Sequence, residues 1–130
     1  MSKKKGSRLE RELLHIFFQN DWHCIRVAGS GSTTELSTDL LAGKNGRVLA
    51  IECKGGKGRR YLDEEQLIDL EEFAKKFGAE AWIGTRFDNN EWLFLKKNQL
   101  EKSKGGVPYI DIELAKRKGL DFKKLINGKI

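Results

Sequence analysis

The stretch that decides the fold is Thr38-Asp-Leu-Leu-Ala-Gly-Lys-Asn-Gly-Arg-Val-Leu-Ala-Ile-Glu-Cys-Lys54. Its two apolar runs, residues 39–42 and 47–54, flank Gly43-Lys-Asn-Gly46, and an Asn-Gly pair between such runs is typical of a tight β-hairpin turn. We therefore predict that the two runs form antiparallel strands. Since side chains alternate along a strand, Glu52 and Lys54 should share one face of the second strand.

The length of the turn decides which residue faces Glu52. A two-residue turn at Asn45-Gly46 places Asp39 directly opposite, with Cβ atoms about 5 Å apart. Carboxylates this close repel each other unless a cation lies between them, and Mg²⁺ prefers such oxygen ligands. A four-residue turn would instead place Ser37 opposite Glu52. A further alternative is that Asp39 and Glu52 only belong to an exposed strand face, where Glu52 forms an ordinary ion pair with Lys54.

Upstream, the apolar residues of segment 8–20 recur with helical spacing, which predicts an amphipathic helix with Ser7 as its N-cap. On the helical wheel Glu10 lies among the apolar side chains, whereas Glu12 falls on the opposite, solvent-facing arc. A carboxylate on an apolar face is costly unless it is paired or binds a metal ion, so Glu10 could be a third acid of the candidate metal site. Equally, Glu10 could only complete a capping box with Ser7.

The rest of the chain alternates strand and helix signals. Residues 1–7 form a basic arm, and the small polar residues of 29–38 predict a mobile loop. Further elements are expected in order along the chain: strands at 24–28, 79–86, 92–95 and near 109–112, and helices from Asp63-Glu-Glu-Gln66 to Gly78 and near 113–118 and 121–127. This order indicates one α/β domain over residues 1–130, with a mixed central β-sheet flanked by α-helices.

The composition favours a polyanionic partner. The 130 residues carry a formal charge of +6, with a pI near 9.4, so nucleic acid is the first candidate. No apolar run approaches the roughly 20 residues that span a bilayer, and the first residues lack the apolar stretch of a signal peptide. We expect a cytoplasmic protein without membrane contact, in which Cys24 and Cys53 are buried reduced thiols.

Five motifs, taken in order, resemble the PD-(D/E)xK nucleases and specifically the archaeal Holliday junction resolvases. They are Gly6-Ser-Arg-Leu-Glu-Arg-Glu-Leu-Leu14, Ile25-Arg-Val-Ala-Gly-Ser-Gly-Ser32, Thr38-Asp-Leu-Leu-Ala42, Ile51-Glu-Cys-Lys54 and Glu65-Gln66. The resemblance extends over residues 6–95, and Thr38 stands where the superfamily motif has its leading proline.

The resemblance implies a restriction-endonuclease-like fold and a homodimer that resolves four-way DNA junctions by paired nicks. It also implies dependence on Mg²⁺, for which Mn²⁺ can substitute. By position, Glu10, Asp39 and Glu52 match the metal site and Lys54 the catalytic lysine. Further matches are Gln66 near that site, and Arg26, Ser30 and Ser32 in a junction-binding strand and loop.

Basic residues around these motifs are suited to contacting phosphates without reading bases, although each could also be ordinary solvated surface. They are Lys3, Lys4, Lys5, Arg8, Lys57, Arg59 and Arg60. Two other functions stay open: another PD-(D/E)xK endonuclease acting on duplex DNA, and a DNA-binding module that does not cleave. The apolar residues Trp82, Trp92, Phe94 and Leu95 could form core or part of a dimer face.

Overall fold

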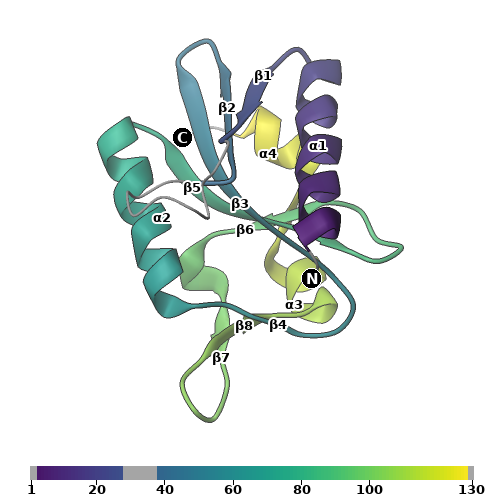
Figure 1. Cartoon of the computed structure of the whole chain (residues 1–130), viewed down its shortest axis with the longest axis vertical. Coiled ribbons are helices and arrows are strands. Elements are labelled where there is room, and N and C mark those ends of the chain that lie inside the picture. Colours follow the sequence, from purple (N-terminus) through teal and green to yellow (C-terminus); the bar gives the residue numbers. More distant parts are fainter. Residues whose placement is uncertain (1–2, 28–37, 129–130) are drawn as a thin grey trace.

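A computed structural model describes residues 3–27 and 38–128, with only the backbone described for residues 3–5. Its centre is a six-stranded mixed β-sheet in the order β1-β2-β3-β5-β6-β9, with helices on both faces (Figure 1). The strands are β1 His23–Arg26, β2 Leu40–Lys44, β3 Arg47–Gly56, β5 Glu80–Phe87, β6 Leu93–Leu95 and β9 Leu120–Asp121. The predicted mixed sheet flanked by helices is confirmed.

The helices divide into two layers according to the core that each one covers. They are α1 Lys3–Gln19, α2 Glu64–Phe77, α3 Ile112–Lys118 and α4 Phe122–Asn127, with a short 3₁₀ helix η1 at Lys97–Gln99. One buried cluster joins α1 and α4 to the sheet, and a second joins α2 and α3 to its other face. A small separate sheet, in the order β4-β8-β7, consists of β4 Arg60–Tyr61, β8 Pro108–Ile110 and β7 Glu101–Lys102.

The β2–β3 hairpin has the two-residue turn. Leu40 pairs with Ile51 and Lys44 with Arg47, which leaves Asn45 and Gly46 as the turn. Both turn residues have positive φ, at 49° and 87°, as a type I′ turn requires. The four-residue alternative is therefore wrong, and the register carried one step beyond Leu40 places Asp39 opposite Glu52.

Strand β3 pairs in parallel with β5, and α2 is the connection between them. The predicted start of α2 is confirmed, because the Asp63 side chain accepts a hydrogen bond from Glu65 N at 2.9 Å. Its predicted end is confirmed too, since Gly78 adopts the left-handed conformation at φ 77°. This crossover leaves β3 in the middle of the sheet, with Glu52 and Lys54 near its carboxyl end.

The prediction of a basic arm at residues 1–7 is wrong for residues 3–7, because α1 already begins at Lys3. Lysine is a good helix former, and Arg26 hydrogen-bonds both Ser7 and Glu10, which ties the early turns of the helix to β1. Ser7 is therefore inside the helix. It cannot be the N-cap of a helix that starts four residues earlier, so the capping-box interpretation of Glu10 is also wrong.

Two other expectations need correction. Thr38, predicted as the end of a mobile loop, is fully buried and its Oγ1 donates a hydrogen bond to Ile51 O at 2.9 Å. The rest of that predicted loop, residues 28–37, lies outside the described residues. Of the two alternatives for Trp82, Trp92, Phe94 and Leu95, core is confirmed and dimer face is wrong, because all four are buried.

Candidate active site

Asp39 and Glu52 face each other across the β2–β3 hairpin. Asp39 Oδ2 accepts a hydrogen bond from Cys53 N at 2.9 Å, which fixes the carboxyl against β3. Burial raises the pKa of Asp39, and it raises the pKa of Glu52 to about 8 with the Asp39 charge as the second cause. Ionising both carboxyls at neutral pH is therefore costly unless a cation lies between them.

Lys54 points to the same side as Glu52, as the strand alternation predicts. Its positive charge lowers the pKa values of both Asp39 and Glu52, although burial and carboxylate repulsion outweigh this effect. The ammonium is thus close enough to act on the same region of space as the two acids. The alternative of an exposed face with an ordinary Glu–Lys pair does not fit, because burial dominates the ionisation of both acids.

Glu10 joins this group from α1. Its charge raises the pKa values of both Asp39 and Glu52, so three carboxylates interact electrostatically. Glu10 is held by Arg26, whose Nε donates to Glu10 Oε1 at 3.1 Å while its Nη2 donates to Ser7 Oγ at 3.2 Å. Arg26, matched by the resemblance to a junction-binding strand, here orients a carboxylate.

The chemistry of these oxygen donors fits a hard divalent cation such as Mg²⁺. In residues 3–27 and 38–128 no three His, Cys, Asp or Glu side chains lie close enough to hold a metal ion as they stand. The opposed pair Asp39 and Glu52 is the part of the site that is already assembled. Glu10, tied to Arg26, is suited to act on the water shell of a cation held by the other two.

Gln66 lies in the first turn of α2, where its side chain is exposed. In the part of the chain that the structure describes, no hydrogen bond joins it to the three carboxylates. The site role that the resemblance assigns to Gln66 therefore stays a prediction.

The predicted DNA-contacting residues differ in their exposure and in their contacts. Arg8 and Lys57 are exposed, whereas Ser30, Ser32 and the side chain of Lys5 lie outside the described residues. Arg59 lies over the Tyr109 ring, with its guanidinium carbon 3.9 Å from the ring centroid. Arg60 begins β4, and its Nε is buried without a hydrogen-bond partner among the described residues.

The Glu12 side chain is 38% exposed, so it does face solvent in part, but the prediction missed its partners. Glu12 Oε1 accepts hydrogen bonds from Arg86 Nε at 2.9 Å and from Trp92 Nε1 at 2.7 Å. These contacts join α1 to strand β5 and to the segment just before β6. Sequence reasoning missed Arg86 and Trp92 because they lie 74 and 80 residues away along the chain, and no local pattern signals such a partner.

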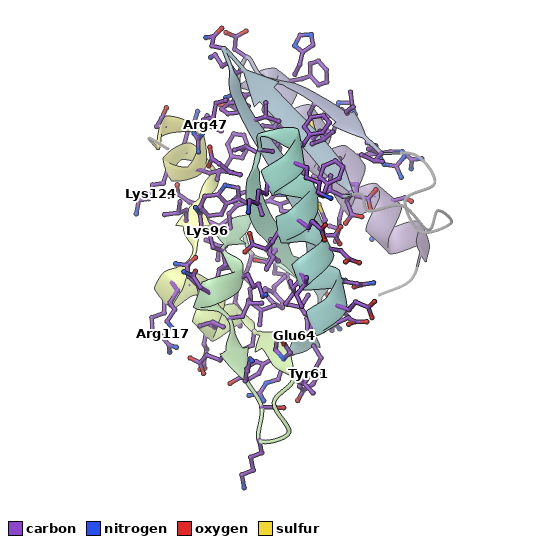
Figure 2. All side chains as sticks on the ribbon, turned by 90° about the vertical axis from the view of Figure 1, so that its left-hand side faces the viewer. Arg47, Tyr61, Glu64, Lys96, Arg117 and Lys124 are labelled. Atoms are coloured by element: carbon purple, nitrogen blue, oxygen red, sulfur yellow. The ribbon has the colours of Figure 1, made fainter. Side chains whose placement is uncertain are left out.

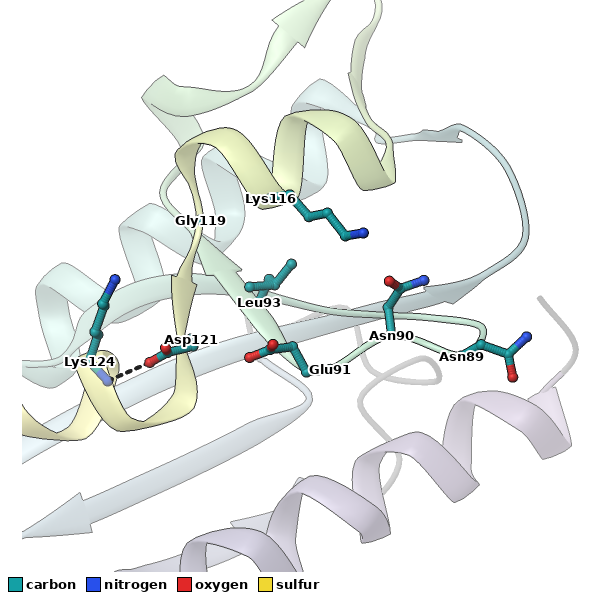
Figure 3. A pocket seen from close by; sticks show the side chains of 8 residues that line it. All are labelled: Asn89, Asn90, Glu91, Leu93, Lys116, Gly119, Asp121 and Lys124. Atoms are coloured by element: carbon teal, nitrogen blue, oxygen red, sulfur yellow. Dashed lines mark hydrogen bonds between the residues drawn. The ribbon is translucent and has the colours of Figure 1, made fainter.

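A polar depression of about 450 Å³ lies away from the carboxylates, between the β5–β6 loop and helices α3 and α4 (Figure 3). Its lining combines two lysines with two carboxylates and two asparagines: Asn89, Asn90, Glu91, Leu93, Lys116, Gly119, Asp121 and Lys124. Asp121 is already used as the N-cap of α4, where it accepts from Lys124 N at 2.8 Å. None of the predicted site residues lines this depression.

Among the described residues, no helix is long and apolar enough to cross a membrane. The family model described as archaeal Holliday junction resolvase (hjc) matches residues 1–129. Crossover junction endodeoxyribonuclease Hjc of Archaeoglobus fulgidus is 33% identical, over 98% of this chain and 99% of its own length. The Hjc of Methanocaldococcus jannaschii is 35% identical, over 95% of this chain and 87% of its own length.

The solved structure of the Archaeoglobus fulgidus Hjc, described as a Holliday junction resolvase from an archaeal hyperthermophile, superposes with a TM-score of 0.83 at 30% identity. The match covers 92% of this chain and 97% of the other. Both sequence and fold therefore agree over nearly the whole length, beyond the segment that carried the sequence motifs. The chain belongs to the archaeal Holliday junction resolvase family.

Proposed function

We propose that this nuclease resolves four-way DNA junctions by divalent-metal-dependent hydrolysis of phosphodiester bonds, with Mg²⁺ as the resident ion and Mn²⁺ as a substitute. The observation that carries the proposal is the half-buried, opposed pair of Asp39 and Glu52 beside Lys54. Such a pair is unstable alone at neutral pH and becomes favourable when a cation separates the two charges.

Each side chain has a distinct task in this mechanism. Asp39 and Glu52 would hold the ion, and Lys54 would orient the attacking water or stabilise negative charge on the phosphate. Glu10, fixed by Arg26, would orient a water bound to that ion. A bound Mg²⁺ would supply charge neutralisation at the scissile phosphate and an activated water.

Paired nicks require two such sites, and one chain carries one, so we propose that the active form is a homodimer. The exposed apolar residues of α2 supply a candidate contact face. Phe77 is 55% exposed and stacks on Phe73, one helical turn earlier on the same side of α2, with ring centroids 5.3 Å apart. This face replaces the four buried residues 82, 92, 94 and 95 as the candidate for the dimer contact.

One experiment tests the reaction. Purified protein is incubated with a four-way junction or with a linear duplex of the same sequence, in Mg²⁺, Mn²⁺ or EDTA. We expect symmetric nicks in the junction alone, in both metals and not in EDTA. Cleavage of both substrates would instead support a general duplex endonuclease, and binding without cleavage in any metal would support a DNA-binding module.

A second measurement tests the dimer. Mass in solution at micromolar concentration should correspond to two chains, and Phe77→Glu should shift it to one because a charge in an apolar contact is costly. Lys76→Glu, on the neighbouring exposed position, is the matched control. A wild-type mass of one chain at this concentration would contradict the proposed dimer.

A further inference from the structure

The small β4-β8-β7 sheet carries a surface that the mechanism does not use. We define the small-sheet surface by six residues of this sheet and of the segments that flank it: Arg59, Arg60, Tyr61, Lys102, Lys104 and Tyr109. Figures 1 and 2 show the β7–β8 hairpin projecting from one end of the molecule. Figure 2 shows Tyr61 near the same end, with Arg47 and Lys124 toward the other.

The projecting hairpin has a defined shape. Ser103 N donates to Val107 O at 2.9 Å, Gly106 N donates to Ser103 O at 2.9 Å, and the Ser103 hydroxyl accepts from Val107 N at 3.2 Å. Gly106 has φ 81°, the left-handed conformation that a glycine adopts at no steric cost. The turn therefore presents Lys104 on a closed hairpin.

The surface also carries two neighbouring aromatic rings, tilted at 57° to each other. Tyr61 is 56% exposed, and its ring lies 6.1 Å from that of Tyr109, centroid to centroid. The guanidinium carbon of Arg59 lies 3.9 Å from the centroid of the Tyr109 ring, so the cation is held against the sheet. Planar guanidinium and phenol hydroxyl groups are common donors to phosphate oxygens.

The cations of this surface exceed the charges that neutralise them. Arg59 and Lys102 have ion pairs only at long distances, 3.8 Å to Asp111 and 3.9 Å to Glu64, and such exposed pairs are weak. Lys104 and Arg60 have no ion pair within the described residues. The nearby Glu101 is already bound by Arg117 at 2.6 Å and by the Tyr109 hydroxyl at 3.2 Å.

The location of the surface relates it to the candidate active site. Strand β4 follows β3 after three residues, and β3 carries Glu52 and Lys54. A nucleic acid whose scissile phosphate lies at the carboxylates could continue past the end of β3 onto the small sheet. Cationic surfaces that also carry planar guanidinium and phenol groups are suited to contacting a phosphate backbone.

We propose that the small-sheet surface binds the phosphate backbone of one duplex arm of the junction, away from the crossover. This inference rests on the proposed function and assigns a further contact region to it. An arm contact of this kind adds affinity without sequence selectivity, and it acts only on arms long enough to reach the projecting hairpin.

The test compares junctions with long and short arms, of about 20 and about 7 base pairs, which correspond to about two helical turns and less than one. Binding is measured in EDTA for the wild type, for Lys102→Ala/Lys104→Ala and for Lys104→Glu, over a range of salt concentrations. Lys123→Ala/Lys124→Ala on α4, at the far end of the molecule, removes the same charge and is the matched control.

For the long-armed junction we expect the Lys102/Lys104 double variant to bind about tenfold more weakly, with a salt slope reduced by up to about 2. Lys104→Glu should weaken binding similarly, and since Lys104 has no ion pair among the described residues this change should not impair folding. The short-armed junction should be bound equally by all variants, and the control should match the wild type on both.

Wild-type affinity of both variants for the long-armed junction would overturn the inference, as would an equal loss on the two junctions. In either case wild-type cleavage of junctions in Mg²⁺ would leave the proposed function intact. If the wild type neither binds nor cleaves four-way junctions, the proposed function falls and the inference falls with it.

Discussion

At the two ends of strand β3, the pKa values of largely buried carboxyls are shifted in opposite directions. At its start, Arg47 binds Glu80 through two hydrogen bonds of 2.7 Å and 3.0 Å, and Trp82 Nε1 donates a third at 3.0 Å. Burial raises the pKa of Glu80, but these donors outweigh it and the pKa is lowered. Near the end of the strand, Glu52 meets Asp39 and its pKa rises to about 8.

The difference shows which end serves stability and which is suited to a ligand. Arg47 also donates to the carbonyls of Leu125, Ile126 and Gly128 at 2.8–3.3 Å, so it ties the end of α4 to the sheet. The Arg47 guanidinium therefore has all these acceptors within the protein. The Asp39 and Glu52 charges repel each other instead, and that uncompensated repulsion makes cation binding favourable.

The largest expected effect is at the repelling end. Asp39→Asn or Glu52→Gln should reduce junction cleavage by at least about a hundredfold, because the ion loses a charged ligand. Junction affinity should stay near the wild-type value or rise, since repulsion of the phosphates falls. Single-turnover cleavage and equilibrium binding of each variant measure the two effects separately, and unchanged turnover in either variant would remove that residue from the site.

The next effect is at the neutralised end. Arg47→Met should lower the free energy of unfolding by about 3 kcal/mol, because it leaves Glu80 buried without its cation and releases the carbonyls of α4. Urea denaturation measures this loss. Lys76→Met, which breaks the exposed pair with Glu72, is the control and should change stability by less than about 0.5 kcal/mol. A loss as small as that of the control would mean that Arg47 contributes no more than a surface ion pair.

The repulsion between Asp39 and Glu52 should make the free energy of unfolding of the metal-free protein depend on pH. Burial and the Asp39 charge raise the pKa of Glu52 above its ordinary value of 4.5. The protonated Glu52 carboxyl therefore contributes fully to folding stability below about pH 4.5, and this contribution is lost as the pH rises through about 8. We expect the free energy of unfolding in EDTA to fall by on the order of 2 kcal/mol between about pH 5 and about pH 9.

Glu52→Gln should flatten this dependence, because it removes one of the two repelling charges, and saturating Mg²⁺ should oppose it in the wild type. Urea titrations at several pH values, with and without Mg²⁺, provide the comparison. The same slope in the wild type and in Glu52→Gln would show that the pH dependence arises elsewhere in the molecule.

The smallest effect separates the two acids of α1. Glu10→Gln should reduce Mg²⁺-dependent cleavage by at least about tenfold, because Glu10 lies beside the repelling pair and a neutral side chain orients a metal-bound water less well. Glu12→Gln should leave cleavage within a few-fold of the wild type, since its charge is taken up by Arg86. It should instead cost about 1 kcal/mol of stability.

Cleavage rates and urea midpoints of the two variants are measured together. Equal cleavage by both variants would remove Glu10 from the site. A large loss of cleavage in Glu12→Gln alone would show that Glu12, the partner of Arg86, acts in the reaction in place of Glu10.

The sequence by itself determined the central hairpin and the faces of the major elements. An Asn-Gly pair between two apolar runs predicted antiparallel strands, and strand alternation placed Glu52 and Lys54 on one face. The opposition of Asp39 and Glu52 depended on the turn length, which the structure fixes at two residues through the positive φ angles of Asn45 and Gly46. The bounds of α2 followed from Asp63 and Gly78 for a similar reason, because caps act within one turn of the helix.

Only the tertiary structure decided which partner each charged side chain has. Helical periodicity separated Glu10 from Glu12 but could not show that Arg26 holds one and Arg86 the other, across 16 and 74 residues of chain. Nor could it show that Arg47 binds Glu80 or that α1 starts at Lys3. A local pattern encodes the direction of a side chain, whereas its ionisation depends on burial and on charges that the fold brings from distant segments.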